Sequence, residues 1–189
     1  MIINIFGPSG SGKTTLIRNL LKSNNIQKFF EKFTNKEFNT DLNKKISISL
    51  IPLPKFRGTV EDLFNIFSIN LEQLLNLENE IQGLSKSIFK EIITKKGLRE
   101  IGIRKIETFS AGETRRLFLL KSLLLESELM IIDEPFSNSD KKLWKLIFEA
   151  IYINPKSIIL SHVPLKKHFI FNKEDISINV NLAREKFKI

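Results

Sequence analysis

The chain has 189 residues, of which 42% are hydrophobic and 27% are charged, the proportions of an ordinary globular domain that can bury its own core. Its net charge of +9 comes from basic residues spread along the sequence, so we expect a solvated basic surface and no nucleic-acid partner. Cysteine is absent, which excludes disulfides and thiolate metal sites, and without a recognisable membrane span or export signal we expect a cytoplasmic location.

The first predicted elements are a buried strand over Ile2–Phe6 and a helix over Thr14–Leu21, joined by a glycine-rich turn. That turn fits the phosphate-loop pattern G-x-x-x-x-G-K-[ST] at every position and has the flanking strand and helix that the pattern requires. Its glycines let backbone N–H groups point inward at phosphate oxygens, and the helix start adds partial positive charge. We expect Lys13 to reach the outer phosphates and the Thr14 hydroxyl to ligate Mg²⁺. The predicted nucleotide-binding residues are Gly7, Pro8, Ser9, Gly10, Ser11, Gly12, Lys13, Thr14 and Thr15.

An alternating strand follows over Lys45–Ile51, and two prolines end it. Beyond Glu61 apolar residues recur at three-to-four spacing with Lys and Glu between them, which predicts helices. We therefore expect a helical subdomain at about residues 61–108 within a single domain of residues 1–189.

Ser110 begins another predicted helix, whose apolar positions run from Leu117 to Leu125. Serine is a favoured N-cap, and a helix start of this kind is a second anion site. Two phosphate-binding helix starts far apart in one chain suggest that two chains share each nucleotide. An ordinary helix cap also accounts for the sequence Ser110-Ala111-Gly112-Glu113.

Two later strands, Leu129–Ile132 and Ser157–Leu160, alternate with helices and predict an α/β fold with a mainly parallel sheet. The first of them ends at two adjacent carboxylates, Asp133 and Glu134. Because ligands sit at the carboxyl ends of parallel strands, we expect Asp133 near the Mg²⁺ that Thr14 also touches. Glu134 could serve as general base on an attacking water.

In this order the motifs resemble those of the ATP-binding-cassette (ABC) ATPases, the motor subunits of ABC transporters, over most of the chain. Gly7–Thr14 resembles their Walker A loop, and Ser110–Glu113 resembles their signature. Asp133-Glu134 is similar to the Walker B aspartate with the catalytic glutamate. Phe136–Asp140 looks like the D-loop, and His162, after a predicted strand, looks like the switch histidine.

The resemblance implies a three-layer P-loop NTPase fold with an inserted helical subdomain, and ATP and Mg²⁺ as cofactors. It implies that two copies, or one copy and a related cassette, close head to tail around ATP. Ser110 and Gly112 would then contact the γ-phosphate from across the interface, and His162 would sense it. Glu113 and Asp140 are further nucleotide-binding residues that the resemblance implies. Closure would drive a separate integral-membrane permease, which implies a peripheral location on the inner face of the cell membrane.

Two features depart from the family pattern. The aromatic residue that stacks on adenine normally lies upstream of Walker A, together with antiparallel strands. Because the loop begins here at residue 7, we expect a pared-down form whose N-terminal antiparallel β-subdomain is reduced or absent. Adenine must then be held by another group, for which Phe29 and Phe30 are candidates. The glutamine that normally follows the strand near residue 50 is also missing, since the glutamines are Gln27, Gln73 and Gln82.

Other classes of protein stay open on the sequence. A soluble ABC-type ATPase acting on nucleic acid or the ribosome fits the basic charge, although the chain has neither a long coiled coil nor a tandem cassette. A P-loop small-molecule kinase fits the phosphate loop and the length but leaves Ser110–Glu113 and Ser161-His162 unexplained. A non-catalytic regulatory cassette is suggested only by the missing glutamine.

Overall fold

The structure is a computed structural model that describes residues 1–34, 46–51, 53–69, 102–125, 127–137, 141–153 and 156–187. The chain divides into two compact units, and each is described by itself. The first unit comprises Met1–Ile51, Ser127–Pro135 and Asn154–Ile189. The second comprises Pro52–Glu126 and Phe136–Ile153. Among the described helices, none combines the length and the apolar character that a membrane crossing requires.

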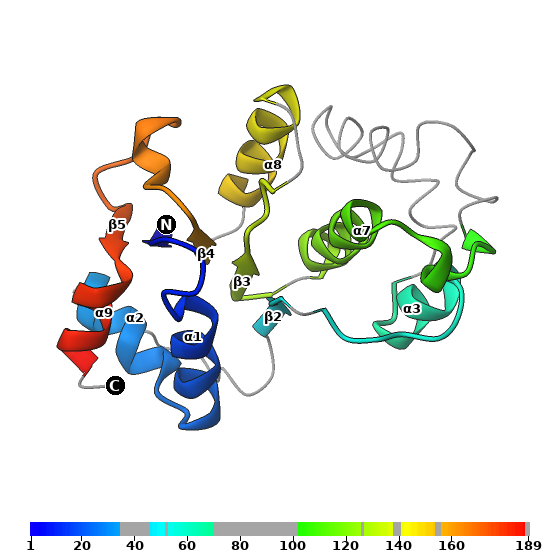
Figure 1. Cartoon of the computed structure of the whole chain (residues 1–189), viewed down its shortest axis with the longest axis horizontal. Coiled ribbons are helices and arrows are strands. Elements are labelled where there is room, and N and C mark those ends of the chain that lie inside the picture. The colour runs from blue at the N-terminus through cyan, green and yellow to red at the C-terminus, as the bar shows by residue number, and fades with distance from the viewer. Residues whose placement is uncertain are drawn as a thin grey trace. The chain divides into compact units, whose positions relative to one another are not determined.

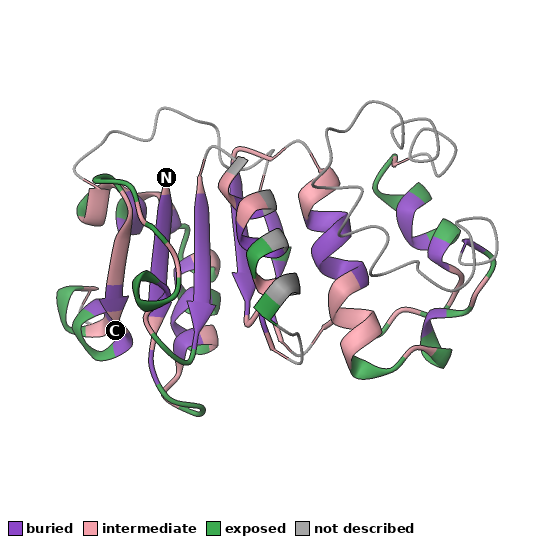
Figure 2. Ribbon diagram, turned by 90° about the horizontal axis from the view of Figure 1, so that it is seen from above, coloured by how far each residue is buried: buried purple, intermediate pink, exposed green. Residues whose placement is uncertain are grey.

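A five-stranded parallel sheet forms the centre of the first unit (Figure 1). Its strand order is β2-β3-β4-β1-β5, and every neighbouring pair is parallel, which confirms the predicted α/β fold. The strands are β1 (Ile2–Phe6), β2 (Ile46–Ser49), β3 (Leu129–Asp133), β4 (Ser157–Ser161) and β5 (Ile176–Asn179). β1, β3 and β4 are buried along nearly their whole length, which is usual for the strands of a parallel sheet (Figure 2).

Three helices of the first unit pack on one face of this sheet. They are α1 (Lys13–Lys22), α2 (Ile26–Thr34) and α9 (Val180–Phe187). Their apolar side chains share one core with alternate residues of the strands, among them Ile3 and Ile5 of β1. Because side chains alternate across a strand, the intervening residue Asn4 lies on the opposite face, next to the short 3₁₀ helix η2 (Leu165–Lys167).

Phe29 and Phe30, the candidates for holding adenine, lie inside this core, so that interpretation is wrong. Their exposed fractions are 0% and 1%. The Phe29 ring packs against Phe33 and Phe187, with ring centroids 4.8 and 5.0 Å away. The apolar side of α2 packs on the sheet and on α9, so neither phenylalanine ring has a face that a ligand could contact.

Helices dominate the described part of the second unit. It contains α3 (Val60–Ile66), the 3₁₀ helix η1 (Ile106–Thr108), α7 (Ala111–Leu124) and α8 (Lys141–Ile153). A second core joins α3, Ile106 and α7. Within the segment expected to form a helical subdomain, about 61–108, α3 is helical, whereas residues 70–101 lie outside the described residues.

We predict that Phe29→Ala lowers the free energy of unfolding by about 3–5 kcal/mol, because it removes a fully buried ring and leaves a cavity. Chemical denaturation measures this loss. The matched variant Phe29→Leu keeps most of the volume and should leave ATP affinity unchanged. A large loss of ATP affinity in a well-folded Phe29→Leu protein would contradict the placement of this ring in the core.

Candidate functional site

The predicted phosphate loop forms the turn between β1 and α1. Gly10 and Gly12 adopt the left-handed region, with φ of 74° and 83°, where residues with a β-carbon are strained. Pro8 and Ser9 are exposed, whereas Lys13 is buried. The loop therefore folds over its lysine and leaves its outer surface open, and its two left-handed glycines are what a turn of inward-pointing N–H groups requires.

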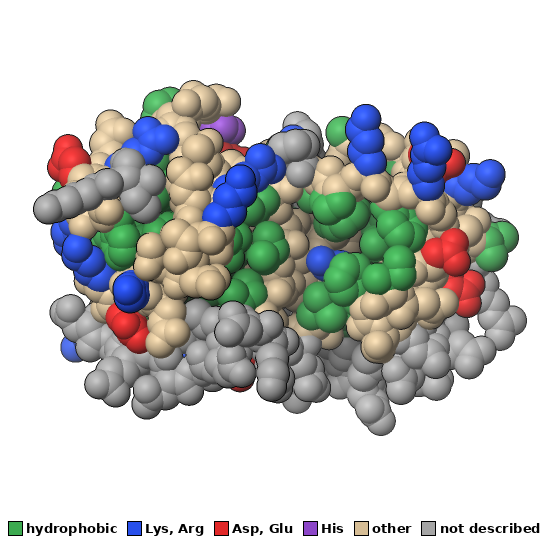
Figure 3. All heavy atoms as spheres, turned by 90° about the horizontal axis from the view of Figure 1, so that it is seen from below, with side chains coloured by type: hydrophobic (Ala, Val, Ile, Leu, Met, Phe, Trp, Pro, Cys, Tyr) green, Lys and Arg blue, Asp and Glu red, His purple; other side chains and the backbone are tan. Residues whose placement is uncertain are grey.

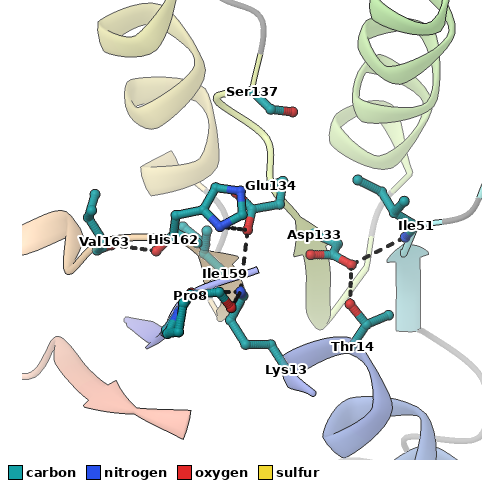
Figure 4. A network of polar contacts seen from close by, with 12 residues as sticks. Pro8, Lys13, Thr14, Ile51, Asp133, Glu134, Ser137, Ile159, His162 and Val163 are labelled. Atoms are coloured by element: carbon teal, nitrogen blue, oxygen red, sulfur yellow. Dashed lines mark hydrogen bonds and ion pairs between the residues drawn. The ribbon is translucent and has the colours of Figure 1, made fainter. Parts of the chain in front are cut away.

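Lys13 is held by its own loop. Its Nζ donates to the carbonyl oxygens of Gly7 at 2.8 Å and Pro8 at 3.1 Å, and the side chain is 6% exposed. The same Nζ lies 3.6 Å from Glu134 Oε1 (Figure 4). A buried ammonium group needs such partners, and carbonyl oxygens are partners that a phosphate oxygen can replace.

Asp133 and Thr14, predicted from distant parts of the sequence to share a metal ion, are in contact. Thr14 Oγ1 donates a hydrogen bond of 2.6 Å to Asp133 Oδ2. The backbone N–H of Ile51, just beyond β2, donates to the same oxygen at 3.3 Å. Arg18 of α1 holds this segment by donating to the Ile51 carbonyl at 3.0 Å. The sheet edge thus presents a carboxylate and a hydroxyl side by side, both of them oxygen ligands.

Glu134 lies at a sharp backbone turn directly after β3. Its φ is 51°, which is uncommon for a residue with a β-carbon, and its N–H donates to the Leu160 carbonyl at 3.0 Å. This turn directs the carboxylate to Lys13 and to His162, whose Nδ1 lies 3.4 Å from Glu134 Oε1. Burial raises the pKa of the Glu134 carboxyl, and the neighbouring His162 and Lys13 act in the opposite direction.

Asn4 supports the site from the opposite face of the sheet and was not among the predicted residues. Its side chain is fully buried, and its Nδ2 donates to the Ile159 carbonyl at 3.2 Å and to Ser161 Oγ at 2.8 Å. Its Oδ1 accepts from the Leu165 N–H at 2.9 Å and from Ser177 Oγ at 3.0 Å. All four hydrogen-bonding positions of the amide are therefore used, which ties β1 to three other segments.

Ser161 connects Asn4 to the turn that carries His162, residues 161–163, which we call the histidine turn. Its Oγ donates to the Val163 carbonyl at 2.6 Å, so a hydrogen bond spans the residue between them, which is His162. The His162 side chain itself is 53% exposed. Its backbone is consequently fixed from β1, while its ring stays accessible. The sequence contains one signal for this support, because Asn4 is an isolated polar residue within the apolar strand Ile2–Phe6.

The predicted signature segment lies in the second unit, where it begins α7 with a capping box. Ser110 Oγ accepts from the Glu113 N–H at 3.2 Å, and the Glu113 carboxylate accepts from the Ser110 N–H at 2.8 Å. Arg104 also binds that carboxylate, with Nη1 2.8 Å from Oε1, and stacks on the Phe109 ring. Arg104 and the Ser110 N–H lower the pKa of Glu113 to about 2.

The predicted residues therefore fall into two groups. The first unit brings together the whole loop from Gly7 to Thr14 with Asp133, Glu134 and His162, and Thr15 lies exposed in the first turn of α1. The second unit carries Ser110, Gly112 and Glu113. Asp140 lies outside the described residues. Within the described part of the chain, no group of three or more His, Cys, Asp or Glu side chains could hold a metal by itself.

Comparison with known proteins identifies the family. The family model for "ABC transporter" matches residues 1–137, which include the phosphate loop, the capping-box segment and both carboxylates. The zinc import ATP-binding protein ZnuC of Ehrlichia canis is 31% identical over 188 residues, which cover 95% of this chain and 69% of that protein. The uncharacterized ABC transporter ATP-binding protein YcbN of Bacillus subtilis is 27% identical over 187 residues. They cover 97% of this chain and 58% of YcbN.

A solved structure supports the fold. An archaeal ribosome recycling factor, in a complex with a ribosomal stalk protein, superposes with a TM-score of 0.56 at 21% sequence identity. The match covers 84% of this chain and 28% of that one. At this identity the likeness shows a shared fold and nothing about the partner.

We predict that Asn4→Leu lowers the free energy of unfolding by about 2–4 kcal/mol, because it leaves the buried Leu165 N–H and Ser161 hydroxyl without this partner. Denaturant titration measures the change. Ser177→Ala removes only one of the four contacts and should cost about 1 kcal/mol or less. Equal effects of the two substitutions would show that the Asn4 network is not a restraint on the fold.

We predict that Glu134→Gln raises the free energy of unfolding more at pH 7 than at pH 3.5. The folded protein raises the pKa of this carboxyl, so its contribution to stability is complete below the unfolded value and is lost as pH rises through the folded pKa. Replacement by a neutral amide removes that loss. Denaturation curves at several pH values measure the difference between variant and wild type.

Glu113→Gln supplies a control of opposite sign. The pKa of Glu113 is lowered, so its contribution is present above the unfolded value and is lost as pH falls toward about 2. Glu113→Gln should therefore destabilise the protein at pH 7 and have little effect near pH 2. The same pH trend for both variants would contradict the assignment of these two environments.

Proposed function

This chain belongs to the ABC transporter family, and we propose that it is an ATP-hydrolysing subunit that drives a separate membrane permease. The observation that carries the proposal is the arrangement of charges beside the phosphate loop. Lys13 and His162 lie 3.6 and 3.4 Å from the same oxygen of Glu134. Thr14 and Asp133 form a second, adjoining pair at the same edge of the sheet. A nucleotide phosphate in the loop would lie beside both groups.

The Thr14–Asp133 pair suits a bound Mg²⁺. Mg²⁺ prefers hard oxygen donors, usually takes only one or two from the protein, and completes its shell with phosphate oxygens and water. Thr14 Oγ1 and Asp133 Oδ2, 2.6 Å apart, provide such a set. When bound there, the ion would neutralise charge on the phosphate oxygens. The Ile51 N–H keeps the carboxylate of Asp133 oriented toward Thr14.

Glu134 is the group that we assign as general base. Water attacks the γ-phosphorus, the bond from that phosphorus to the bridging oxygen breaks, and Glu134 Oε1 takes a proton from the water. A buried carboxyl with a raised pKa is better matched to this task than an exposed one. Lys13 would exchange its bonds to the Gly7 and Pro8 carbonyls for bonds to phosphate oxygens. His162 would contact the γ-phosphate with its exposed ring.

The second cassette and the permease follow from the family rather than from this chain alone. Relatives such as ZnuC are named as import ATP-binding proteins, which supports a transport role. We propose that two cassettes close around ATP, with the start of α7 of one facing the phosphate loop of the other. Such a subunit would lie on the inner face of the cell membrane, held there by its permease.

Charge distribution supports a role without nucleic acid. Among the described side chains on the face drawn in Figure 3, lysines and arginines stand at several separate places. Nucleic-acid-binding proteins usually gather basic residues along one face. The family match also favours the ATPase over the small-molecule kinase.

We predict that Glu134→Gln lowers the rate of ATP hydrolysis by about 100-fold or more while ATP binding persists, because it removes only the proton acceptor. Phosphate release and equilibrium titration measure the two properties. With MgATP, light scattering of the same variant should give the mass of a dimer.

Lys13→Ala is the control, since it should lose ATP affinity as well as turnover. Full hydrolysis by Glu134→Gln would exclude this residue as the base. Failure of that variant to dimerise while it still binds ATP would exclude the homodimer and require a related cassette as partner.

A further inference from the structure

Helix α9 lies against both ends of the phosphate loop, at Gly7 and at Gly12. Val180 and Arg184 are four residues apart and therefore lie on the same face of this helix. A β-carbon on Gly7 would lie 2.8 Å from Val180 Cγ1, and one on Gly12 would meet the Arg184 guanidinium, with Cζ 2.8 Å away. The first and last glycines of the loop are thus the residues that allow α9 to approach this closely.

Arg184 brings a guanidinium to the loop without a partner of its own. Among the described residues it makes no hydrogen bond and no ion pair, in contrast to Lys13, which has two carbonyls and Glu134. Its side chain is half-buried, because it lies along the loop rather than extending into water. A partly desolvated cation is costly unless something complements it, and a bound anionic nucleotide would do so.

The order of the strands indicates which part of a nucleotide Arg184 meets. Asp133 and Glu134 follow β3, on one side of β1, and α9 follows β5, on the other side. Thr14 and Lys13 face the carboxylates, so the γ-phosphate end of a nucleotide is directed toward β3. Its nucleoside end must then leave the loop on the side of β5 and α9, where Arg184 lies against Gly12.

We propose that Arg184 binds the nucleoside end of ATP, with its guanidinium plane packed on the purine ring. A guanidinium is planar and stacks on aromatic faces, and such a contact is strengthened when it is desolvated. This assignment rests on the proposed function, since it requires that the loop binds ATP. It also supplies a holder for the base in the first unit, where Phe29 and Phe30 are buried.

The test compares two ligands that share the phosphate chain, MgATP and magnesium tripolyphosphate, by calorimetric titration of the whole chain. Arg184→Ala should raise the Kd for ATP about tenfold and leave the Kd for tripolyphosphate within about twofold of wild type. Arg184→Lys should resemble Arg184→Ala, because an ammonium group keeps the charge but lacks the plane. Thermal unfolding without ligand confirms that both variants fold.

Lys186→Ala is the matched control. It removes the same charge from the same helix, but Lys186 lies over the Phe33 ring, with Nζ 5.0 Å from the centroid, and should leave both ligands unaffected. Equal weakening of ATP and tripolyphosphate by Arg184→Ala would overturn the purine contact in favour of a phosphate contact. Unchanged ATP affinity would exclude any contact.

The proposed function fails in a different way. If the wild-type chain binds neither ligand, or if Lys13→Ala binds both as well as wild type does, then the loop is not a nucleotide site. An intact response to Lys13→Ala together with no response to Arg184→Ala would overturn only the role of Arg184.

Discussion

The parallel pairing of β4 between β1 and β3 is the constraint on which the site depends. Its register sets Phe6 beside Ser161 and Asp133 beside Leu160, so three strands end at one level. Main-chain bonds continue the ladder past those ends, from the Gly7 N–H to the Ser161 carbonyl and from the Glu134 N–H to the Leu160 carbonyl. The phosphate loop, Glu134 and His162 directly follow the ends of β1, β3 and β4. Their closeness is therefore a result of sheet register and not of side-chain contacts.

Strand register also explains why a buried asparagine is tolerated in β1. Asn4 lies on the sheet face opposite Ile3 and Ile5, and it meets the carbonyl of Ile159 and the hydroxyl of Ser161 on the neighbouring strand. A polar group at this depth is destabilising unless every donor and acceptor is used. Since all are used, the amide of Asn4 is held in one orientation, and its bond to Ser161 restrains the turn that carries His162.

Much of this arrangement could be predicted from the sequence because the signals were local. The strands at Ile2–Phe6, Leu129–Asp133 and Ser157–Ser161 are continuous apolar runs, and their bounds agree with the prediction within a residue. The motif Gly7–Thr14 fixes its own turn through glycines. The Ser110 cap is likewise a short-range pattern, and the capping box confirms it.

What the sequence did not reveal depends on contacts between distant residues. β5 and α9 escaped prediction because Ile176–Asn179 is short and half-buried, and only its pairing with β1 makes it a strand. Phe29 and Phe30 were assigned to a ligand because exposed and buried aromatic residues look alike in a sequence. Arg104 lies nine residues from Glu113, and no spacing rule links the two.

The capping box defines which groups of the second unit remain available to an anion. The carboxylate of Glu113 is occupied by the Ser110 N–H and by Arg104, so it cannot also serve a phosphate, and its negative charge would oppose one. Ala111 and Gly112 are the first two residues of α7, so their N–H groups have no acceptor within the helix, whereas the Glu113 N–H bonds Ser110 Oγ. Main-chain N–H groups at a helix start are donors of the kind that bind anions, so the nucleotide contact proposed for this segment would use them. In that proposal the part of Glu113 is structural, because its bonds to the Ser110 N–H and to Arg104 hold the start of α7 in place.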